Sequence, residues 1–124
     1  MTAFVKEIEV ERLCLAYGTK EVLHGITFDV YRNEILAVIG PAQSGKTSML
    51  RCLNRTIDFT ASATVSGTVR VAGEDVRRTK DIFALRRKIG VVFQEFRLLS
   101  HLSAFDNVAL PLRVVNARES DIKK

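Results

Sequence analysis

The residues best suited to chemistry lie between Gly40 and Ser48, where the sequence is Gly-Pro-Ala-Gln-Ser-Gly-Lys-Thr-Ser. Gly40 and Gly45 permit the tight backbone curvature that turns successive N–H groups toward one point, and such converging donors bind phosphate oxygens. At this spacing, Lys46 reaches the β- and γ-phosphates of a nucleotide, and the Thr47 hydroxyl ligates Mg²⁺. The sequence therefore predicts a phosphate-binding loop over residues 40–48.

The segments on either side of this loop have the character needed to position it. Residues 35–39 are continuously apolar, which predicts a strand that is buried on both faces, as in the centre of a parallel sheet. Residues 49–53 are compatible with a helix, whose N-terminus adds unpaired N–H groups and the positive end of its dipole. Strand, glycine loop and helix in this order favour phosphate binding over a simple turn with a solvated Lys46.

Two earlier segments predict an antiparallel layer. Residues 7–10 and residues 26–30 alternate between polar and apolar side chains, and short turn-forming stretches follow each of them. The alternation slips near Arg12, so either a β-bulge or the end of a strand is expected there. Residues 56–66 are expected to be a surface connection, after which alternation resumes over residues 65–71.

The second half of the chain repeats the strand-to-loop pattern. Residues 89–93 form another continuous apolar run, which predicts a second buried parallel strand that ends at Gln94. A short helix is expected over residues 81–87. Residues 103–106 have the spacing of a capping box with Asp in place of Glu, and the helix that they begin is expected to kink or break near Pro111.

The bulk composition narrows the class of protein. The 124 residues carry a net charge of +5 and are 47% hydrophobic, enough for the core of one domain or part of one. No apolar run approaches the length of a membrane span, and the charged N-terminus lacks the apolar region of a secretory signal, so a cytoplasmic location is expected. Cys14 and Cys52 lack metal-ligand spacing and are expected to be reduced thiols. The basic cluster over residues 77–88 lacks interleaved aromatics suited to stacking bases, because its Phe83 is an apolar position of the short helix expected there, so nucleic-acid binding is not expected.

Taken together, these motifs resemble the N-terminal part of an ATP-binding subunit of an ABC transporter. The resemblance extends from about Ile8 to Lys124 and implies an α/β fold, a partial P-loop NTPase core of the ABC ATPase type, with parallel strands plus an antiparallel β layer. Tyr17 lies where the family has an aromatic residue that stacks on adenine. Gln94 matches the strand-to-loop glutamine, and residues 102–112 resemble the helix that follows it.

The resemblance implies a role for each matched residue, with ATP and Mg²⁺ as the bound species. It assigns Lys46 and Gln94 to catalysis, the lysine by neutralising charge on the β- and γ-phosphates and the glutamine by reaching Mg²⁺ and the attacking water. Thr47 and Gln94 are the expected metal ligands. The expected nucleotide-binding residues are Tyr17, Gly40, Gln43, Ser44, Gly45, Lys46, Thr47 and Ser48.

Within this set, Ser48 would contact the α-phosphate and the backbone donors of residues 43–47 would hold the β-phosphate. Gln43 stands where family loops usually carry a third glycine, a departure that the general phosphate-loop pattern tolerates. His24 and His101 do not match the position of the family's switch histidine and are expected to be surface or packing residues.

Several family motifs have no match in the sequence: a Leu-Ser-Gly-Gly-Gln signature, a second apolar strand that ends in Asp-Glu, and the switch histidine. Residues 1–124 are therefore expected to be the N-terminal portion of an ABC ATP-binding domain, comprising the β subdomain and the phosphate-loop core. Phosphoryl transfer depends on positioning and charge stabilisation by the missing parts. The 124-residue chain alone is expected to bind nucleotide weakly and to hydrolyse ATP negligibly.

The resemblance also implies a setting for the complete protein. It would couple ATP hydrolysis to solute import, as a dimer with a second ATP-binding subunit, and would lie on the inner or plasma membrane through transmembrane transporter subunits. Residues 53–55 and 65–69 look most like phosphate-importer ATPases, so phosphate is the expected solute. Two alternatives remain open: a P-loop kinase for a small metabolite, and a regulatory or pseudo-ATPase module that docks through residues 94–112.

Overall fold

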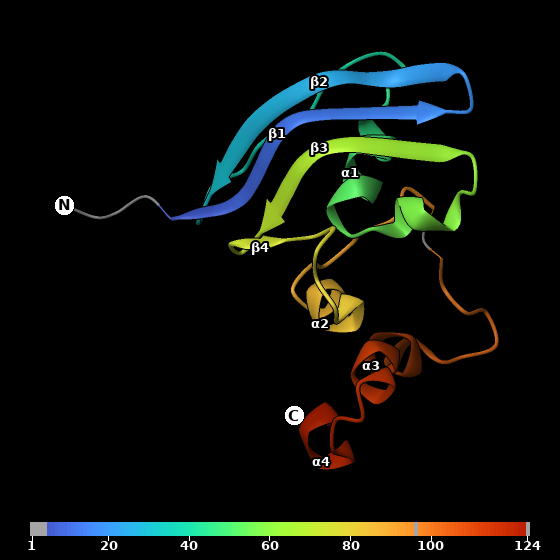
Figure 1. Cartoon of the computed structure of the whole chain (residues 1–124). Helices are drawn as coiled ribbons and strands as arrows, with labels where there is room; N and C mark the ends of the chain where they lie inside the picture. Colours follow the sequence, from blue (N-terminus) through green and yellow to red (C-terminus); the bar gives the residue numbers. More distant parts are fainter. Residues whose placement is uncertain (1–4, 96, 124) are drawn as a thin grey trace. The chain divides into compact units, whose positions relative to one another are not determined.

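The computed structural model describes residues 5–95 and 97–123 and has two compact units, Met1–Gly90 and Val91–Lys124 (Figure 1). The first unit contains a β-sheet with helices packed on it, and the described residues of the second contain the helices α3 (Ala104–Val114) and α4 (Glu119–Ile122). No helix in the described part of the chain is both long enough and apolar enough to cross a membrane.

The first unit is built on a four-stranded sheet with the order β2-β1-β3-β4 (Figure 1). Its strands are β1 (Lys6–Tyr17), β2 (Lys20–Tyr31), β3 (Ala63–Val71) and β4 (Glu74–Asp75). Every pair of neighbours is antiparallel, so the predicted antiparallel layer is confirmed. The strands extend beyond the alternating segments because register shifts let the hydrogen-bonded ladder continue where the side-chain alternation slips.

A β-bulge explains the slip near Arg12. In the register of β1 with β3, Arg12 and Leu13 lie opposite Gly67 alone. Arg12 has φ 48° and Gly67 has φ 90°, both in the left-handed region. The extra residue brings Val10 and Leu13 onto the same buried face although they are three positions apart. Of the two alternatives, the bulge is correct.

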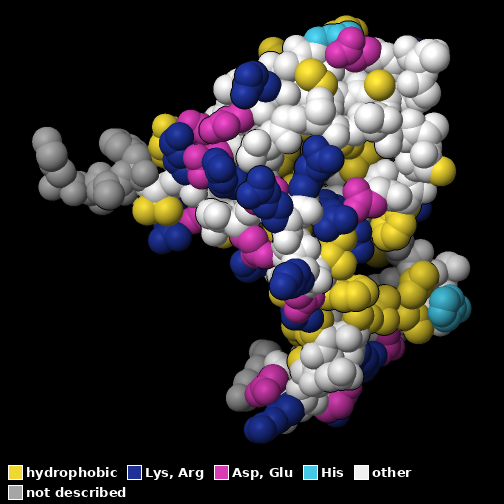
Figure 2. Space-filling view, viewed as in Figure 1, with side chains coloured by type: hydrophobic (Ala, Val, Ile, Leu, Met, Phe, Trp, Pro, Cys, Tyr) yellow, Lys and Arg dark blue, Asp and Glu magenta, His cyan; other side chains and the backbone are white. Residues whose placement is uncertain are grey.

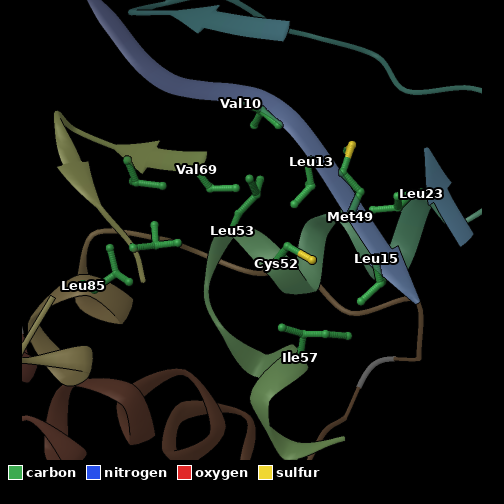
Figure 3. Packing of buried hydrophobic residues seen from close by; sticks show 12 residues of the cluster. Val10, Leu13, Leu15, Leu23, Met49, Cys52, Leu53, Ile57, Val69 and Leu85 are labelled. Carbon is green, nitrogen blue, oxygen red and sulfur yellow. The ribbon is translucent and has the colours of Figure 1, made fainter. Parts of the chain in front are cut away.

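One face of this sheet is covered by α1 (Lys46–Leu53), by the short helix η1 (Thr56–Phe59) and by α2 (Ile82–Arg87). Figure 3 shows their apolar side chains directed toward those of the sheet. The buried cluster consists of Val10, Leu13, Leu15, Leu23, Met49, Cys52, Leu53, Ile57, Val69, Val71, Val76 and Leu85. Residues 56–66 are therefore more than the predicted surface connection, since Ile57 is only 3% exposed and closes one end of the core.

Arg86 ties α2 to the end of α1. Its Nε donates to the carbonyl of Asn54 at 3.1 Å and its Nη2 donates to the carbonyl of Arg55 at 3.2 Å. The guanidinium also lies over the ring of Phe59, 5.1 Å from its centroid. These contacts satisfy carbonyl groups that the C-terminus of a helix leaves unpaired, and they place a cation at the negative end of the helix dipole.

The two predicted parallel strands are not formed. In the described residues, neither 35–39 nor 89–93 is hydrogen-bonded to another strand. Ile35 is 96% exposed and Val92 is 100% exposed, so the expected burial is also wrong. A single extended segment gains no ladder of hydrogen bonds, and its apolar side chains become buried only when neighbouring strands and covering helices are present.

The second unit contains α3 (Ala104–Val114) and α4 (Glu119–Ile122). The Ser103 hydroxyl accepts the Asp106 N–H at 3.0 Å and donates to the Asp106 carboxylate at 2.5 Å, so the predicted N-terminal cap of α3 is confirmed. The Ser103 hydroxyl and then the Arg113 guanidinium lower the pKa of Asp106. The helix α3 continues past Pro111 to Val114, so of the predicted kink or break at the proline, the break does not occur.

The basic residues of the first unit are interspersed with acidic ones on the face that Figure 2 shows. Lys88 forms an ion pair with Glu74 at 2.9 Å, and Arg78 lies 3.6 Å from Asp75. The Thr79 hydroxyl and then Lys88 lower the pKa of Glu74. Part of the positive charge in this cluster is thus used within the fold.

Cys52 supplies a testable property of the core. Both cysteines are free, and Cys52 is only 3% exposed. Burial raises the pKa of the Cys52 thiol from 9.0 to about 11, because the thiolate would lose its hydration. The folded state holds this proton more tightly than the unfolded state does. Stability should therefore fall as the pH rises from 9.0 to about 11.

This prediction is checked by urea unfolding of the wild type and of Cys52→Ala at several pH values in this window. The Ala variant should be less stable than the wild type at every pH in this window, because the substitution leaves a small cavity. It also lacks the thiol, so its stability should not show the thiol's contribution to the pH dependence. The stability difference between the two proteins should shrink toward high pH. A difference that stayed constant would contradict the raised pKa.

Candidate functional site

The predicted phosphate-binding loop leads into α1, whose first N–H groups have no hydrogen-bond partner among the described residues. Gly45 is the N-cap of α1, with φ 93°, and no side chain caps the helix. The first helical hydrogen bond runs from the Met49 N–H to the Gly45 carbonyl at 2.8 Å. The preceding N–H groups of the helix are thus available to an anion, and the helix dipole favours negative charge at this end.

Gly45 also fixes where the loop lies. A Cβ built at this position would be 2.8 Å from Cδ2 of Leu23 and 3.0 Å from Cγ1 of Val22. Leu23 is itself buried in the core. The backbone of the loop therefore lies so close to β2 that only a residue without a side chain fits. Glycine also adopts the positive φ that this position has.

A cavity of 310 Å³ opens between this loop and the β1–β2 hairpin. Among the described residues, it is lined by Tyr17, Lys20, Val22, Gln43, Ser44, Gly45, Lys46, Thr47 and Ser48. Two of these side chains are lysines and none is acidic. Uncapped N–H groups at the start of α1, hydroxyls and two lysines around an open cavity are chemistry suited to a phosphorylated ligand.

Lys46 holds the loop in a closed curve. Its Nζ donates to the carbonyls of Gly40 at 2.8 Å and Pro41 at 2.6 Å, and to the Ser44 hydroxyl at 3.3 Å. An ammonium group has three donors, so these contacts use all of them. A phosphate must replace at least one of these acceptors, and the exchange is favourable because a charged oxygen is a stronger acceptor than a carbonyl.

Tyr17 lines the same cavity from the end of β1. Its hydroxyl donates to the Ser48 hydroxyl oxygen at 3.0 Å. The ring is partly buried against the core cluster. The structure therefore brings Tyr17 together with residues 43–48, which the sequence had grouped with it only through the family resemblance.

Gln43 adopts the backbone conformation that its position requires, at a cost. It has φ 63°, in the left-handed region, where a residue with a Cβ is strained by about 1–2 kcal/mol. This geometry agrees with the expectation that a glycine is the usual residue here. The Gln43 side chain lines the cavity, so its substitution changes the surface that a ligand would meet.

Gln94 lies in the second unit, at an exposed bend after residues 91–93. Its expected contact with Mg²⁺ and with the attacking water stays a prediction. Thr47 is exposed and lines the cavity, where its hydroxyl is available as one oxygen ligand for a metal. In the part of the chain that the structure describes, no cluster of three His, Cys, Asp or Glu side chains could hold a metal ion. The available donor therefore fits an Mg²⁺ ion that a nucleotide's phosphates bring with them.

The sequence interpretation missed two residues of the cavity wall, Lys20 and Val22. Lys20 is the cross-strand partner of Tyr17, because a two-residue turn at Gly18 and Thr19 joins β1 to β2. The sequence indicates this turn, and the strand register that a two-residue turn implies places Lys20 beside Tyr17, the residue expected to stack on adenine.

Comparisons with known proteins identify relatives for most of the chain. Residues 23–124 match the ABC transporter family. The chain is 40% identical over 113 residues to the phosphate import ATP-binding protein PstB 1 of Yersinia pestis bv. Antiqua, covering 90% of this chain and 42% of the relative. It is 35% identical over 116 residues to PstB 2 of Lactobacillus acidophilus, covering 93% of this chain and 46% of the relative. The chain thus spans less than half the length of these relatives.

Two solved structures have a similar fold. One is cbiO1 from Clostridium perfringens, part of the ABC transporter complex cbiONQ, with a TM-score of 0.78 and 24% identity over 96% of this chain and 47% of that chain. The other is a bacterial Atm1-family ABC exporter with ATP bound, with a TM-score of 0.71 and 24% identity over 89% of this chain and 18% of that chain. The expected fold class, a partial P-loop domain with an antiparallel β layer, is confirmed, although its parallel strands are not formed.

Proposed function

The chain belongs to the ABC transporter family, and from this premise we propose that it is part of an ATP-binding subunit that couples ATP binding and hydrolysis to solute import. The observation that carries this proposal is the cavity between the loop and the β1–β2 hairpin, which Lys46, the start of α1 and Tyr17 line together. Phosphate donors and an aromatic ring that line one cavity suit a nucleoside triphosphate.

We propose the following roles for the residues of the site. The backbone N–H groups of residues 43–47 and the Lys46 ammonium hold the β- and γ-phosphates, and the Tyr17 ring stacks on the adenine. Thr47 is the ligand that this cavity offers to Mg²⁺, and the bound ion neutralises charge on the phosphate oxygens. Gln94 is proposed to orient the attacking water. The loop's close fit against Leu23 keeps these donors in place without reorganisation.

The remaining parts of the proposal concern the complete protein. Residues 1–124 would form the N-terminal portion of its ATP-binding domain. This domain would work as a dimer with a second ATP-binding subunit, next to transmembrane subunits that hold it at the membrane. The phosphate importers among its relatives support inorganic phosphate as the solute. The solute would be bound by other subunits, so this chain's own chemistry concerns ATP.

Hydrolysis by this chain alone is expected to be negligible. The sequence lacks an acidic strand-end pair and a signature motif, which would supply charge stabilisation and the facing half of the site. A coupled phosphate-release assay on purified monomeric protein checks this expectation. A turnover of about 1 s⁻¹ or more that depended on Lys46 would contradict it.

The proposed function is tested by titrating the chain with ATP in the presence and absence of Mg²⁺. Wild-type protein should bind ATP more tightly with Mg²⁺, and Thr47→Val should lose this difference while its Mg²⁺-free affinity stays the same. Thr47→Ser is the matched control, because it keeps the hydroxyl and should keep the Mg²⁺ effect. Equal affinity of the wild type for adenosine and for ATP would contradict a phosphate-binding site.

A further inference from the structure

The hydrogen bond between Tyr17 and Ser48 joins two walls of the cavity that are 31 positions apart in the sequence. Tyr17 is the last residue of β1, and Ser48 lies in the first turn of α1. The bond is 3.0 Å long and partly buried, and both residues line the cavity. A residue expected only to stack on a base is therefore also in direct contact with the loop that is expected to bind phosphates.

The end of β1 holds the Tyr17 hydroxyl in a defined place. Tyr17 is paired with Lys20 in β2 and with Ala63 in β3, so its backbone is fixed from both sides. Its ring packs against the buried cluster. A hydroxyl carried by a central strand and a packed ring loses little further freedom when it forms a hydrogen bond, and this favours a stable contact.

Tyr17 and Ser48 each contribute a hydroxyl to this bond, so either group can supply its hydrogen. A serine hydroxyl has one hydrogen to donate and two lone pairs to accept with. When Tyr17 donates and the Ser48 oxygen accepts, the hydrogen of Ser48 remains available to donate to an anion. Among the described residues it has no other hydrogen-bond partner. Donors in such a chain polarise one another, so the Ser48 hydroxyl becomes a stronger donor toward an anion in the cavity.

We propose that Tyr17 is a phosphate-positioning residue, whose hydroxyl holds Ser48 in the orientation that donates to the α-phosphate of a bound nucleoside triphosphate. This inference rests on the proposed function and adds a role for Tyr17 that its ring does not supply. It makes base binding and phosphate binding interdependent. A base that displaces the Tyr17 ring would also disturb the Ser48 donor.

A double-mutant cycle on ATP binding tests the inference, with wild type, Tyr17→Phe, Ser48→Ala and the double variant titrated by NMR in Mg²⁺. Phe keeps the ring and removes the hydroxyl. Tyr17→Phe should weaken ATP binding by about two- to tenfold, as expected for one hydrogen bond. Adding Tyr17→Phe to Ser48→Ala should then cause no further loss, because the two groups act in series.

Two controls separate the role of the Tyr17 hydroxyl from that of its ring. Tripolyphosphate has no base, and it should show the same loss for Tyr17→Phe as ATP does. Three results would overturn the inference. Tyr17→Phe could bind both ligands as the wild type does, or it could lose affinity for ATP alone. The third result is a loss of affinity that persists in full on the Ser48→Ala background. If wild-type ATP binding did not depend on Lys46, the proposed function itself would fail, and this inference with it.

Discussion

Gly67→Ala should destabilise the first unit by about 3 kcal/mol or more, or prevent it from folding. A Cβ at this position would lie 2.3 Å from the carbonyl oxygen of Arg12 and 2.7 Å from that of Glu11. Both atoms are backbone atoms of the bulge in β1, so they cannot move away without breaking the register. The positive φ of Gly67, 90°, adds about 1–2 kcal/mol of strain for any residue with a Cβ.

Gly73→Ala is the matched control for this variant. Gly73 also has a positive φ, 77°, but a Cβ there would have no atom within 4 Å. Its cost should therefore be limited to the strain of about 1–2 kcal/mol. Urea unfolding followed by circular dichroism measures both variants, and equal losses of stability would contradict the steric account of the bulge.

Lys46→Ala should weaken ATP binding by at least about tenfold, because a hydrogen bond to a charged group contributes about 1.5–3 kcal/mol. The loss has two causes. The ammonium that would contact the β- and γ-phosphates is removed, and the carbonyls of Gly40 and Pro41 lose the donor that curves the loop around the cavity. Isothermal titration with ATP and Mg²⁺ measures the effect.

Lys20→Ala is the comparison, because Lys20 lines the same cavity from the hairpin side. Lys20 is more exposed than Lys46, so solvent screens its charge, and its removal should weaken binding by only about two- to threefold. If the two alanine variants lost affinity equally, ATP binding would depend on the overall positive charge of the cavity and not on the position of Lys46.

The sequence predicted those parts of the structure that depend on nearby residues. Alternation located the antiparallel strands, and the slip near Arg12 marked the bulge. The spacing of Ser103 and Asp106 located the cap of α3. Each of these features is decided within a few residues, by the direction of successive side chains or by a hydroxyl within reach of a free N–H.

For features that depend on residues distant in the sequence, the predictions were wrong or were not made. A continuous apolar run such as residues 35–39 predicts a buried strand only if other strands and helices cover it, and the described residues supply none. The hydrogen bond between Tyr17 and Ser48 requires the end of β1 to lie beside α1, which no local pattern reveals. Lys20 was within reach of sequence reasoning, since the hairpin register pairs it with Tyr17.

The roles of the individual site residues are still predictions, because they concern a bound nucleotide. The geometry of the loop agrees with phosphate binding, since Gly45 has the φ and the close packing that its position demands. Gln43 keeps the left-handed conformation although it has a side chain. Gln94 lies in the other unit, and its proposed action on water depends on parts of the active site that this sequence does not contain.

The central claim is that the loop over residues 40–48 binds the phosphates of ATP through Lys46. An NMR titration of ¹⁵N-labelled chain with ATP and Mg²⁺ tests it most directly, because each backbone N–H reports on its own surroundings. The largest shifts should occur at residues 43–48 and at Tyr17, and they should nearly vanish in Lys46→Ala under the same conditions. Identical shifts in both proteins, or shifts centred elsewhere in the chain, would contradict the claim.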